Sequence, residues 1–254
     1  MTENAPDPMT RDVCRTGRSG RQRAVLLGFG LGGIFVVISI VAAAAGWWAP
    51  SADRYVQGVD VSAHQGHIDW DALARAGVRF AYIKSSEGAS FVDPRFSANW
   101  RDAGRAGLRR GAYHRFTLCR SAAGQAANFI RTVPRAGDAL PPAVDVENFQ
   151  DCASQTAVAQ IEEFLDTVEA HYGARPILYV TRQFHDAHQR DFPHERFWIR
   201  SLYAPPEFGR ADWVIWQHHN NATRPGIEAP VDLDAFRGDE AALARFARNR
   251  EPTT

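Results

Sequence analysis

The feature that most constrains the fold is an alternation of strand-like and helix-like segments, which begins at residue 57 and fills most of the remaining chain. Short β-branched or aromatic runs at 57–62, 78–86, 109–116, 141–147 and 176–181 are followed by segments with helical spacing at 68–77, 94–107, 121–133, 154–173 and 182–190. Three more strand-like runs follow at 196–203, 212–219 and 231–236, with loops between them. Alternating β and α segments favour a parallel sheet. We therefore predict an α/β fold, a TIM-like barrel of the (β/α)5(β)3 type.

The helix expected at 154–173 has the clearest sequence signals for its two ends. Ser154 or Thr156 can act as its N-cap, because a hydroxyl oxygen accepts a hydrogen bond from a free backbone N–H. Gly173 is a stop signal, because glycine readily adopts the left-handed conformation that ends many helices.

Residues 24–48 form an uncharged, apolar run that is long enough to cross a bilayer, whose hydrocarbon core needs about 20 residues of helix. Five arginines precede this run and two tryptophans end it: Arg11, Arg15, Arg18, Arg21, Arg23, Trp47 and Trp48. Basic residues on the cytoplasmic side and tryptophans at the interface are typical of a membrane anchor. We predict a basic cytoplasmic head at 1–23, a transmembrane signal anchor at 24–48, a linker at 49–55 and an exported domain at 56–250, in the periplasm or at the cell surface.

Two other interpretations of this segment compete with the anchor. A signal peptide cleaved near AAAAG would release the domain in a secreted form, but the apolar cores of signal peptides usually run about 7 to 15 residues, which is shorter than this one. A buried core helix of this length would normally have a polar face. The retained anchor is therefore the favoured interpretation.

The charges of the whole chain cancel, with 29 Lys and Arg against 29 Asp and Glu. A nucleic-acid-binding protein usually carries a basic excess, so we expect no nucleic-acid partner. A length of 254 residues suits one large catalytic domain with a short appendage. We expect this domain to be monomeric.

Two of the three cysteines, Cys119 and Cys152, lie in the predicted exported part, whereas Cys14 lies in the cytoplasmic head. Oxidising compartments permit disulfides. Each of the two exported cysteines follows a predicted strand by a few residues, and the loops after neighbouring parallel strands meet at one end of a barrel. We predict a Cys119–Cys152 disulfide, with two unpaired thiols as the alternative.

Functional side chains of a parallel barrel collect at the carboxyl ends of its strands. Five carboxylates stand at or near such positions in the predicted strands: Asp60, Glu87, Asp145, Glu147 and Asp232. We expect these acidic residues to converge on one rim.

The pair Asp145 and Glu147 is the sharpest functional signal in the sequence. Residues i and i+2 of a strand point to the same face, about 6.5 to 7 Å apart along the chain. Two carboxylates in one partly buried cleft do not ionise equally, so one keeps its proton near neutral pH and can act as a general acid. Glycosidic bond cleavage uses such a pair of carboxylates. A solvated acidic loop is the alternative, but Ala143, Val144 and Val146 indicate a buried strand.

Aromatic residues in or just beyond the predicted strands support binding of carbohydrate, because flat rings stack on the apolar faces of sugars. These residues are Tyr82, Tyr113, Phe116, Tyr179, Trp198, Tyr203 and Trp216. Most of them could instead belong to the core. We place Tyr113 and Trp216 in the site first.

Other catalytic chemistries are poorly supported. The histidines at positions 185, 188, 218 and 219 have no spacing that suits a metal-ligand set, and the cysteine spacing matches no zinc pattern. Ser62, Ser85 and Ser86 lack the G-x-S-x-G motif of serine hydrolases. We expect neither a metal nor another cofactor.

Seven motifs in register resemble glycoside hydrolase family 25, the Chalaropsis-type lysozymes: GVDVSAHQGHIDW, FAYIKSSEG, GLRRGAYHRF, QAANFI, LPPAVDVE, WVIWQHH and VDLDAF. The resemblance covers about residues 56–237. It implies a (β/α)5(β)3 barrel that hydrolyses the β-1,4 bond between N-acetylmuramic acid and N-acetylglucosamine in peptidoglycan, so that 56–250 would be a catalytic barrel with glycan strands as its partner.

Matched position by position, the resemblance implies that Glu147 is the general acid and Asp145 its acidic partner. Asp60 and Asp232 match the two other carboxylates of the family's site, and Lys84, Glu87, Tyr113 and Gln217 fall within matched motifs. The chain departs from the family at Ala63, where a second histidine is frequent, which would alter hydrogen bonding near Asp60. The membrane segment is a further departure, since most family members are secreted.

The stereochemical course stays open at this point. Carboxylates about 6.5 Å or more apart fit inversion, whereas retention through a covalent intermediate needs about 5 to 5.5 Å. The family is thought to retain configuration. Our hypothesis is substrate-assisted hydrolysis, in which Glu147 is acid and then base while Asp145 orients the 2-acetamido group of the substrate.

Two other functions also remain open. The chain could be a non-catalytic, membrane-tethered module that binds peptidoglycan, although buried acidic pairs argue against that. It could also be a related hydrolase of another N-acetylated glycan such as chitin.

Overall fold

The computed structural model describes residues 52–147, 153–202, 205–206 and 213–248, all of which belong to one compact unit, Pro50–Thr254. The predicted head, the predicted span at 24–48 and the linker residues 49–51 lie outside the described residues. Within the described ranges, no helix has both the length and the apolar composition needed to cross a bilayer. The anchor therefore stays a prediction.

The helices and strands follow the expected order, with short additions at the ends. The parallel-strand region contains β1 (Val56–Val61), α2 (Trp70–Arg75), β2 (Phe80–Glu87), β3 (Phe91–Val92), α3 (Phe96–Arg105), β4 (Arg109–Arg115), α4 (Ala122–Thr132), β5 (Ala143–Val146), α5 (Ser154–Tyr172), β6 (Ile177–Thr181) and α6 (Arg182–His188). The remaining elements are β7 (Phe197–Arg200), β8 (Trp213–Arg224), β9 (Ile227–Phe236), α7 (Glu240–Arg248) and the 3-10 turns η1 (Ala52–Arg54) and η2 (Ala63–Gln65).

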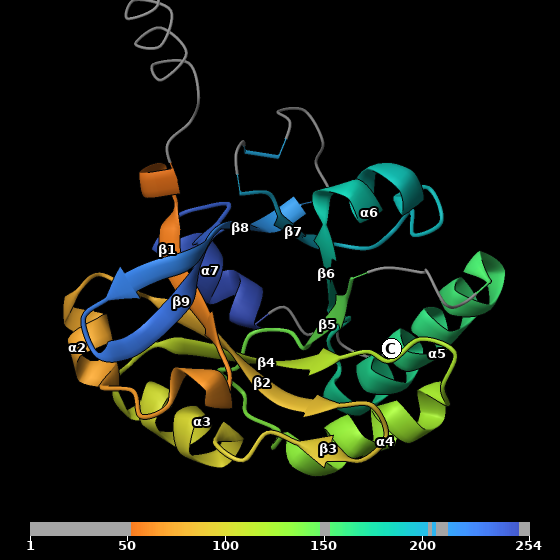
Figure 1. The fold of residues 1–254 in the computed structure, drawn as a ribbon, viewed down its shortest axis with the longest axis horizontal. Helices are drawn as coiled ribbons and strands as arrows, with labels where there is room; N and C mark the ends of the chain where they lie inside the picture. The colour runs from red at the N-terminus through yellow and green to blue at the C-terminus, as the bar shows by residue number, and fades with distance from the viewer. Residues whose placement is uncertain (1–51, 148–152, 203–204, 207–212, 249–254) are drawn as a thin grey trace, which may run out of the picture. The chain divides into compact units, whose positions relative to one another are not determined.

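Eight strands close into a barrel (Figure 1). Strand β1 pairs in parallel with β2 and antiparallel with β9, so the sheet returns to its first strand. The order around the barrel is β1-β2-β4-β5-β6-β7-β8-β9, and β3 extends β2 as a short hairpin. The predicted barrel with five β/α units and three further strands is confirmed.

Alternation along each strand separates the barrel interior from the layer beneath the helices. On β2, Phe80 and Tyr82 point into the interior cluster, whereas Ala81 and Ile83 pack in the outer cluster with the helices. This period of two is the geometry of a β-strand. It fixes which side chains can reach the mouth of the barrel.

Two glycines make room for the largest interior rings. A Cβ on Gly58 of β1 would lie 2.3 Å from the Phe80 ring, and one on Gly111 of β4 would lie 2.3 Å from the Tyr82 ring. Tyr82 in turn packs on Trp198, with ring centroids 4.9 Å apart. The interior of the barrel is therefore filled by aromatic rings, which form the floor beneath the mouth.

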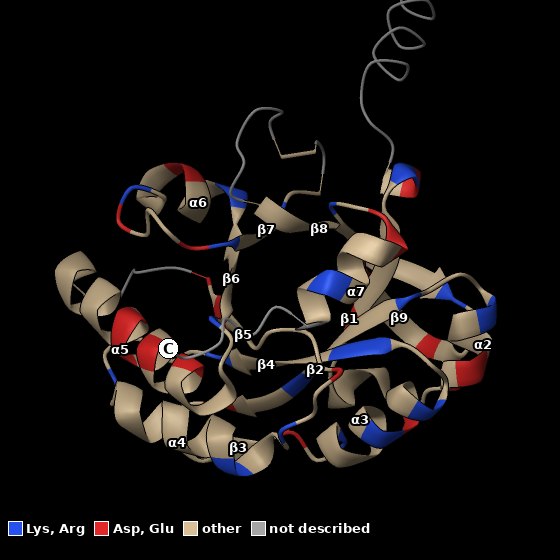
Figure 2. Cartoon of the chain, turned by 180° about the vertical axis from the view of Figure 1, so that it is seen from behind, with Lys and Arg blue, Asp and Glu red and all other residues tan. Residues whose placement is uncertain are grey.

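Helix α5 is tied to the barrel through Arg175, which follows it. The Arg175 guanidinium contacts Glu162 at 2.6 Å, Glu169 at 3.0 Å and the buried Glu195 at 2.7 Å. Figure 2 shows acidic residues, in red, along α5. Because Glu195 precedes β7, the network links a covering helix to the segment that leads into that strand.

The ends of α5 match the sequence analysis in part. Gly173 is the C-cap with φ 66°, as expected. The N-cap prediction is wrong: Ala153 occupies that position and Ser154 is already the first helical residue.

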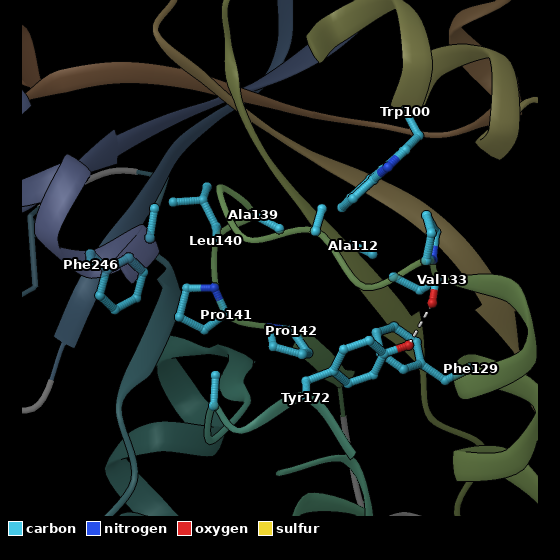
Figure 3. A pocket seen from close by; sticks show the side chains of 14 residues that line it. Trp100, Ala112, Phe129, Val133, Ala139, Leu140, Pro141, Pro142, Tyr172 and Phe246 are labelled. Carbon is cyan, nitrogen blue, oxygen red and sulfur yellow. Dashed lines mark hydrogen bonds between the residues drawn. The ribbon is translucent and has the colours of Figure 1, made fainter. Parts of the chain in front are cut away.

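The amino-terminal side of the sheet carries a small apolar cavity of about 30 Å³ (Figure 3). It lies among residues that precede β5, such as Leu140 and Pro142, and side chains of the covering helices, such as Phe129 and Phe246. The Tyr172 hydroxyl donates a hydrogen bond to the Val133 carbonyl at 2.8 Å. Among the described residues, no carboxylate or basic side chain lines this cavity. It belongs to the packing of the fold.

The last two strands differ from the expectation. Runs 212–219 and 231–236 are parts of two longer strands that form an antiparallel hairpin turning at Pro225 and Gly226. Gly226 has φ 91°, a left-handed conformation that glycine adopts without strain. Strand β9 therefore runs opposite to β1. Asp232 lies at the mouth because it pairs with Asp60 in this antiparallel register, and not because it ends a parallel strand.

The packing around the two interior glycines gives a testable result. Gly58→Ala and Gly111→Ala should each lower the free energy of unfolding by about 1 to 3 kcal/mol, because the added methyl overpacks an aromatic ring. Urea unfolding followed by tryptophan fluorescence measures this. Gly137→Ala is the matched control, since its Cβ would meet nothing within 4 Å. Equal stability of all three variants would contradict the packing described.

Candidate active site

A pocket of about 160 Å³ opens where the parallel strands end. Its lining combines carboxylates, cations and aromatic rings: Asp60, Ser62, His64, Lys84, Tyr113, Arg115, Asp145, Glu147, Tyr179, Trp198 and Asp232. A neighbouring hollow of about 320 Å³ shares Arg115, Asp145 and Glu147 with it and adds Glu87 and Phe116. Asp145 and Glu147, the predicted pair, thus lie where the pocket and the hollow meet.

Asp145 is held inside the barrel mouth by β5, with Val144 and Val146 buried on the opposite face. Only 9% of Asp145 is exposed, and its Oδ1 atom has no hydrogen-bond partner among the described residues. Burial raises the pKa of Asp145 to about 7, and the neighbouring charge of Glu147 adds to the increase. Arg115 and Lys84 act in the opposite direction. Asp145 is therefore a carboxyl group that holds a proton near neutral pH.

Glu147 follows β5 directly and faces solvent, with 40% of its side chain exposed. Its Oε2 atom lies 3.3 Å from a guanidinium nitrogen of Arg115. The pair thus combines a buried carboxyl, Asp145, whose pKa is raised, with an accessible one, Glu147.

Asp60 and Asp232 lie opposite each other because β1 and β9 pair in antiparallel register at these two residues. The Gln217 amide nitrogen donates to Asp60 at 2.7 Å and to Asp232 at 3.3 Å, while its oxygen accepts a hydrogen bond from Tyr179 at 3.0 Å. Burial raises the pKa of Asp60 well above its ordinary value, and the charges of Asp234 and Asp232 reinforce this. Gln217 therefore organises an acidic wall of the pocket.

Asp234 is a further carboxyl that the sequence analysis did not single out. It is fully buried one step deeper on β9 and accepts a hydrogen bond from the Trp198 indole at 2.8 Å. Burial raises its pKa well above the ordinary value. The motif VDLDAF contained a signal for it, because residues i and i+2 of a strand share a face.

Lys84 and Glu87 form an ion pair of 2.7 Å on the β2 side of the pocket. Burial alone would raise the pKa of Glu87, but the hydrogen bond and charge of Lys84 outweigh it and lower the pKa. Tyr113 lies between this pair and the acidic wall, and burial together with the charges of Asp60 and Asp145 raises its pKa. Lys84 and Tyr113 line the pocket, and Glu87 lines the neighbouring hollow.

The predicted aromatic residues lie at different distances from the pocket. Tyr113, Tyr179 and Trp198 line the pocket, and Tyr82 lies beneath them. Phe116 packs against His114 and Phe164 and borders only the neighbouring hollow. Tyr203 lies outside the described residues.

Trp216 does not line the pocket. Its neighbours Ile215 and Gln217 both point inward, so Trp216 points into the outer layer, where its indole donates to the Ser201 carbonyl at 2.8 Å. Placing Trp216 in the site first was therefore incorrect, and strand alternation is the physical reason.

Three pocket residues, Ser62, His64 and Arg115, had no assigned role in the sequence analysis. The Ser62 hydroxyl lies 2.9 Å from Nδ1 of His64 and caps the turn η2, which holds that ring in the pocket lining. At the position of the family departure, the backbone N–H of Ala63 donates to Asp93 at 2.8 Å.

Within the described ranges, no three His, Cys, Asp or Glu side chains are arranged to hold a metal ion. Cys119 adopts a left-handed conformation with φ 56° in the loop after β4. Its expected partner Cys152 lies outside the described residues, so the disulfide stays a prediction.

Comparison with known proteins agrees with this geometry. Residues 59–227 match the model of glycosyl hydrolases family 25. The protein YegX of Escherichia coli K12 is 35% identical over 203 residues, which cover 77% of this chain and 74% of that protein. Lysozyme M1 of Streptomyces globisporus is 31% identical over 218 residues, covering 79% and 74%.

A solved structure gives the same result. The family 25 glycosyl hydrolase from Bacillus anthracis aligns with a TM-score of 0.73 at 35% identity, covering 78% of this chain and 97% of that one. The closed barrel, the acidic mouth and these matches lead to one assignment: the chain belongs to glycosyl hydrolases family 25.

Proposed function

We propose that the chain is a peptidoglycan hydrolase, an N-acetylmuramidase that cleaves the β-1,4 bond between N-acetylmuramic acid and N-acetylglucosamine. The observation that carries the proposal is the pair of unequal carboxyls, the buried Asp145 and the accessible Glu147, at the mouth of the barrel. The similarity to Lysozyme M1 of Streptomyces globisporus supports the choice of substrate.

In the proposed mechanism the carboxyl pair holds one proton and the substrate moves it. The free site keeps the proton on Asp145, because burial raises the pKa of that group to about 7. A 2-acetamido N–H that donates to Asp145 stabilises its ionised form, since hydrogen bonds to a carboxylate lower its pKa. The proton then belongs on Glu147, which protonates the glycosidic oxygen as general acid.

The second half of the reaction uses the same two groups. The acetamido oxygen attacks the anomeric carbon while the glycosidic bond breaks, and Asp145 stabilises the positive charge on the acetamido group. Glu147, now ionised, removes a proton from the water that opens the cyclic intermediate. Product forms with retained configuration, and Asp60 and Asp232 line the pocket in which the positive charge develops.

The first test is release of muropeptides from purified peptidoglycan by the full chain, with the reducing ends identified by mass. The parent should release muramic-acid reducing ends with the β-anomer formed first, and Glu147→Gln should lower the rate by about 100-fold or more, the contribution of a general acid. Glu163→Gln on the exposed face of α5 is the matched control and should act like the parent.

Each other outcome has a distinct meaning. The α-anomer as first product would rule out the substrate-assisted course. Faster release from chitin than from peptidoglycan would assign another N-acetylated glycan as substrate. Binding without release from either polymer would identify a non-catalytic module.

We also propose that residues 24–48 anchor the domain in a membrane, with the catalytic barrel on the exported side and a Cys119–Cys152 disulfide beside its mouth. The uncharged run and the arginines before it support the anchor. Alkaline carbonate extracts peripheral proteins but not spanning ones, so the full chain should stay in the membrane fraction. Recovery of a soluble chain that begins near residue 46 would instead indicate a cleaved signal peptide.

A further inference from the structure

A second polar pocket, of about 540 Å³, lies at the carboxyl ends of β6 and β7. Helix α6 borders it and packs against both strands (Figure 1). Its charged lining residues are Arg182, Asp186 and Arg200, so the pocket is positive. The catalytic pocket has a different lining, with four carboxyl groups beside Lys84 and Arg115.

Arg200 connects the two pockets. It is the last residue of β7, in register with Thr181 on β6 and with Gln217 on β8. Its positive charge acts on Asp232 and Tyr179, both of which line the catalytic pocket. The guanidinium therefore lies at the edge of the site.

The charge of Arg200 acts on Asp232, but no carboxylate of the described residues lies within ion-pair distance of its guanidinium. Among the described residues, Arg200 forms no ion pair and no side-chain hydrogen bond. The nearby acid Asp186 lies 3.6 Å from Arg182 and 3.5 Å from the His185 ring. Since Asp186 already has a cationic partner, Arg200 is available for an external anion.

The substrate proposed above carries such an anion on one sugar only. Muramic acid bears a lactyl ether that ends in a carboxyl group, either free or linked to an acidic peptide, whereas N-acetylglucosamine has no acid. An anionic substituent is attracted to the positive pocket beside the catalytic pocket. A guanidinium binds carboxylates with two parallel hydrogen bonds.

We propose that Arg200 binds a carboxylate of the substituent on muramic acid, and that this contact selects wall glycan over neutral N-acetylated polymers. The inference rests on the proposed function and names the group that would give the site its specificity. It assigns the pocket between β6 and β7 to the lactyl or peptide branch of the substrate.

The test measures the affinity of soluble glycan strands by calorimetry, with Glu147→Gln as background so that nothing is cleaved. Three ligands are compared: strands with stem peptides, strands stripped of peptide that expose the lactyl carboxylate, and stripped strands with that carboxylate converted to a neutral amide. Adding Arg200→Gln should weaken binding of a carboxylate-bearing ligand by about 10- to 100-fold, the effect of one lost charge-assisted contact, and leave the amidated ligand unchanged.

Arg200→Lys keeps the charge but loses the two-pronged geometry, so its affinity should lie between those of the parent and Arg200→Gln. Arg105→Gln on α3, with 74% of its side chain exposed, is the control for the loss of one positive charge. Loss for peptide-bearing strands alone would assign the anion to the peptide, and loss for stripped strands alone would assign it to the lactyl group.

Equal weakening for the acidic and amidated strands, or no weakening for any, would overturn the proposal. Because the assay measures binding, it gives an answer even if the parent proves inactive, and failure of the proposed hydrolysis is recognised separately by the absence of reducing ends.

Discussion

The closure of the sheet by β9 is the constraint on which the site depends. This strand lies antiparallel between β8 and β1, and its register with β1 sets Asp232 opposite Asp60. The parallel strands β1, β2 and β4 to β8 alone would bring only their carboxyl ends together. The antiparallel return adds carboxylates from the middle of β9 to the same mouth, so the acidic wall facing Asp145 is a product of barrel closure.

Desolvation then raises the pKa values of the buried carboxyl groups at the mouth. The aromatic floor of Tyr82 and Trp198 excludes water beneath the mouth, so the buried acids Asp60, Asp145 and Asp234 all have raised pKa values. Ionising such groups destabilises the folded state, and a site of this kind is kept for its chemistry rather than for stability. Glu147, in contrast, is exposed to solvent, so the two carboxyls of the pair lie in different environments, as acid–base catalysis needs.

The sequence predicted the barrel and the Asp145–Glu147 pair because strand–helix alternation and the i, i+2 spacing are local properties. It misplaced Trp216 because inward and outward positions differ by a single residue, and naming Gln217 as a site residue already implied that Trp216 points outward. Asp234 on β9 and Arg200 on β7 follow the same inward and outward alternation. Their positions near the mouth, however, depend on how these strands pair with their neighbours. The hairpin of β8 and β9 was missed because its central residues are polar.

The most direct test of the account is a ¹³C NMR titration of the aspartate carboxyl carbons in the full chain, with Asp145 assigned by the signal lost in Asp145→Asn. The account predicts a midpoint near pH 7 for Asp145, and a higher midpoint in Arg115→Gln, because the Arg115 charge lowers that pKa. A midpoint below about 5, in the ordinary range for aspartate, would contradict the claim that burial raises the pKa of Asp145 into the neutral range.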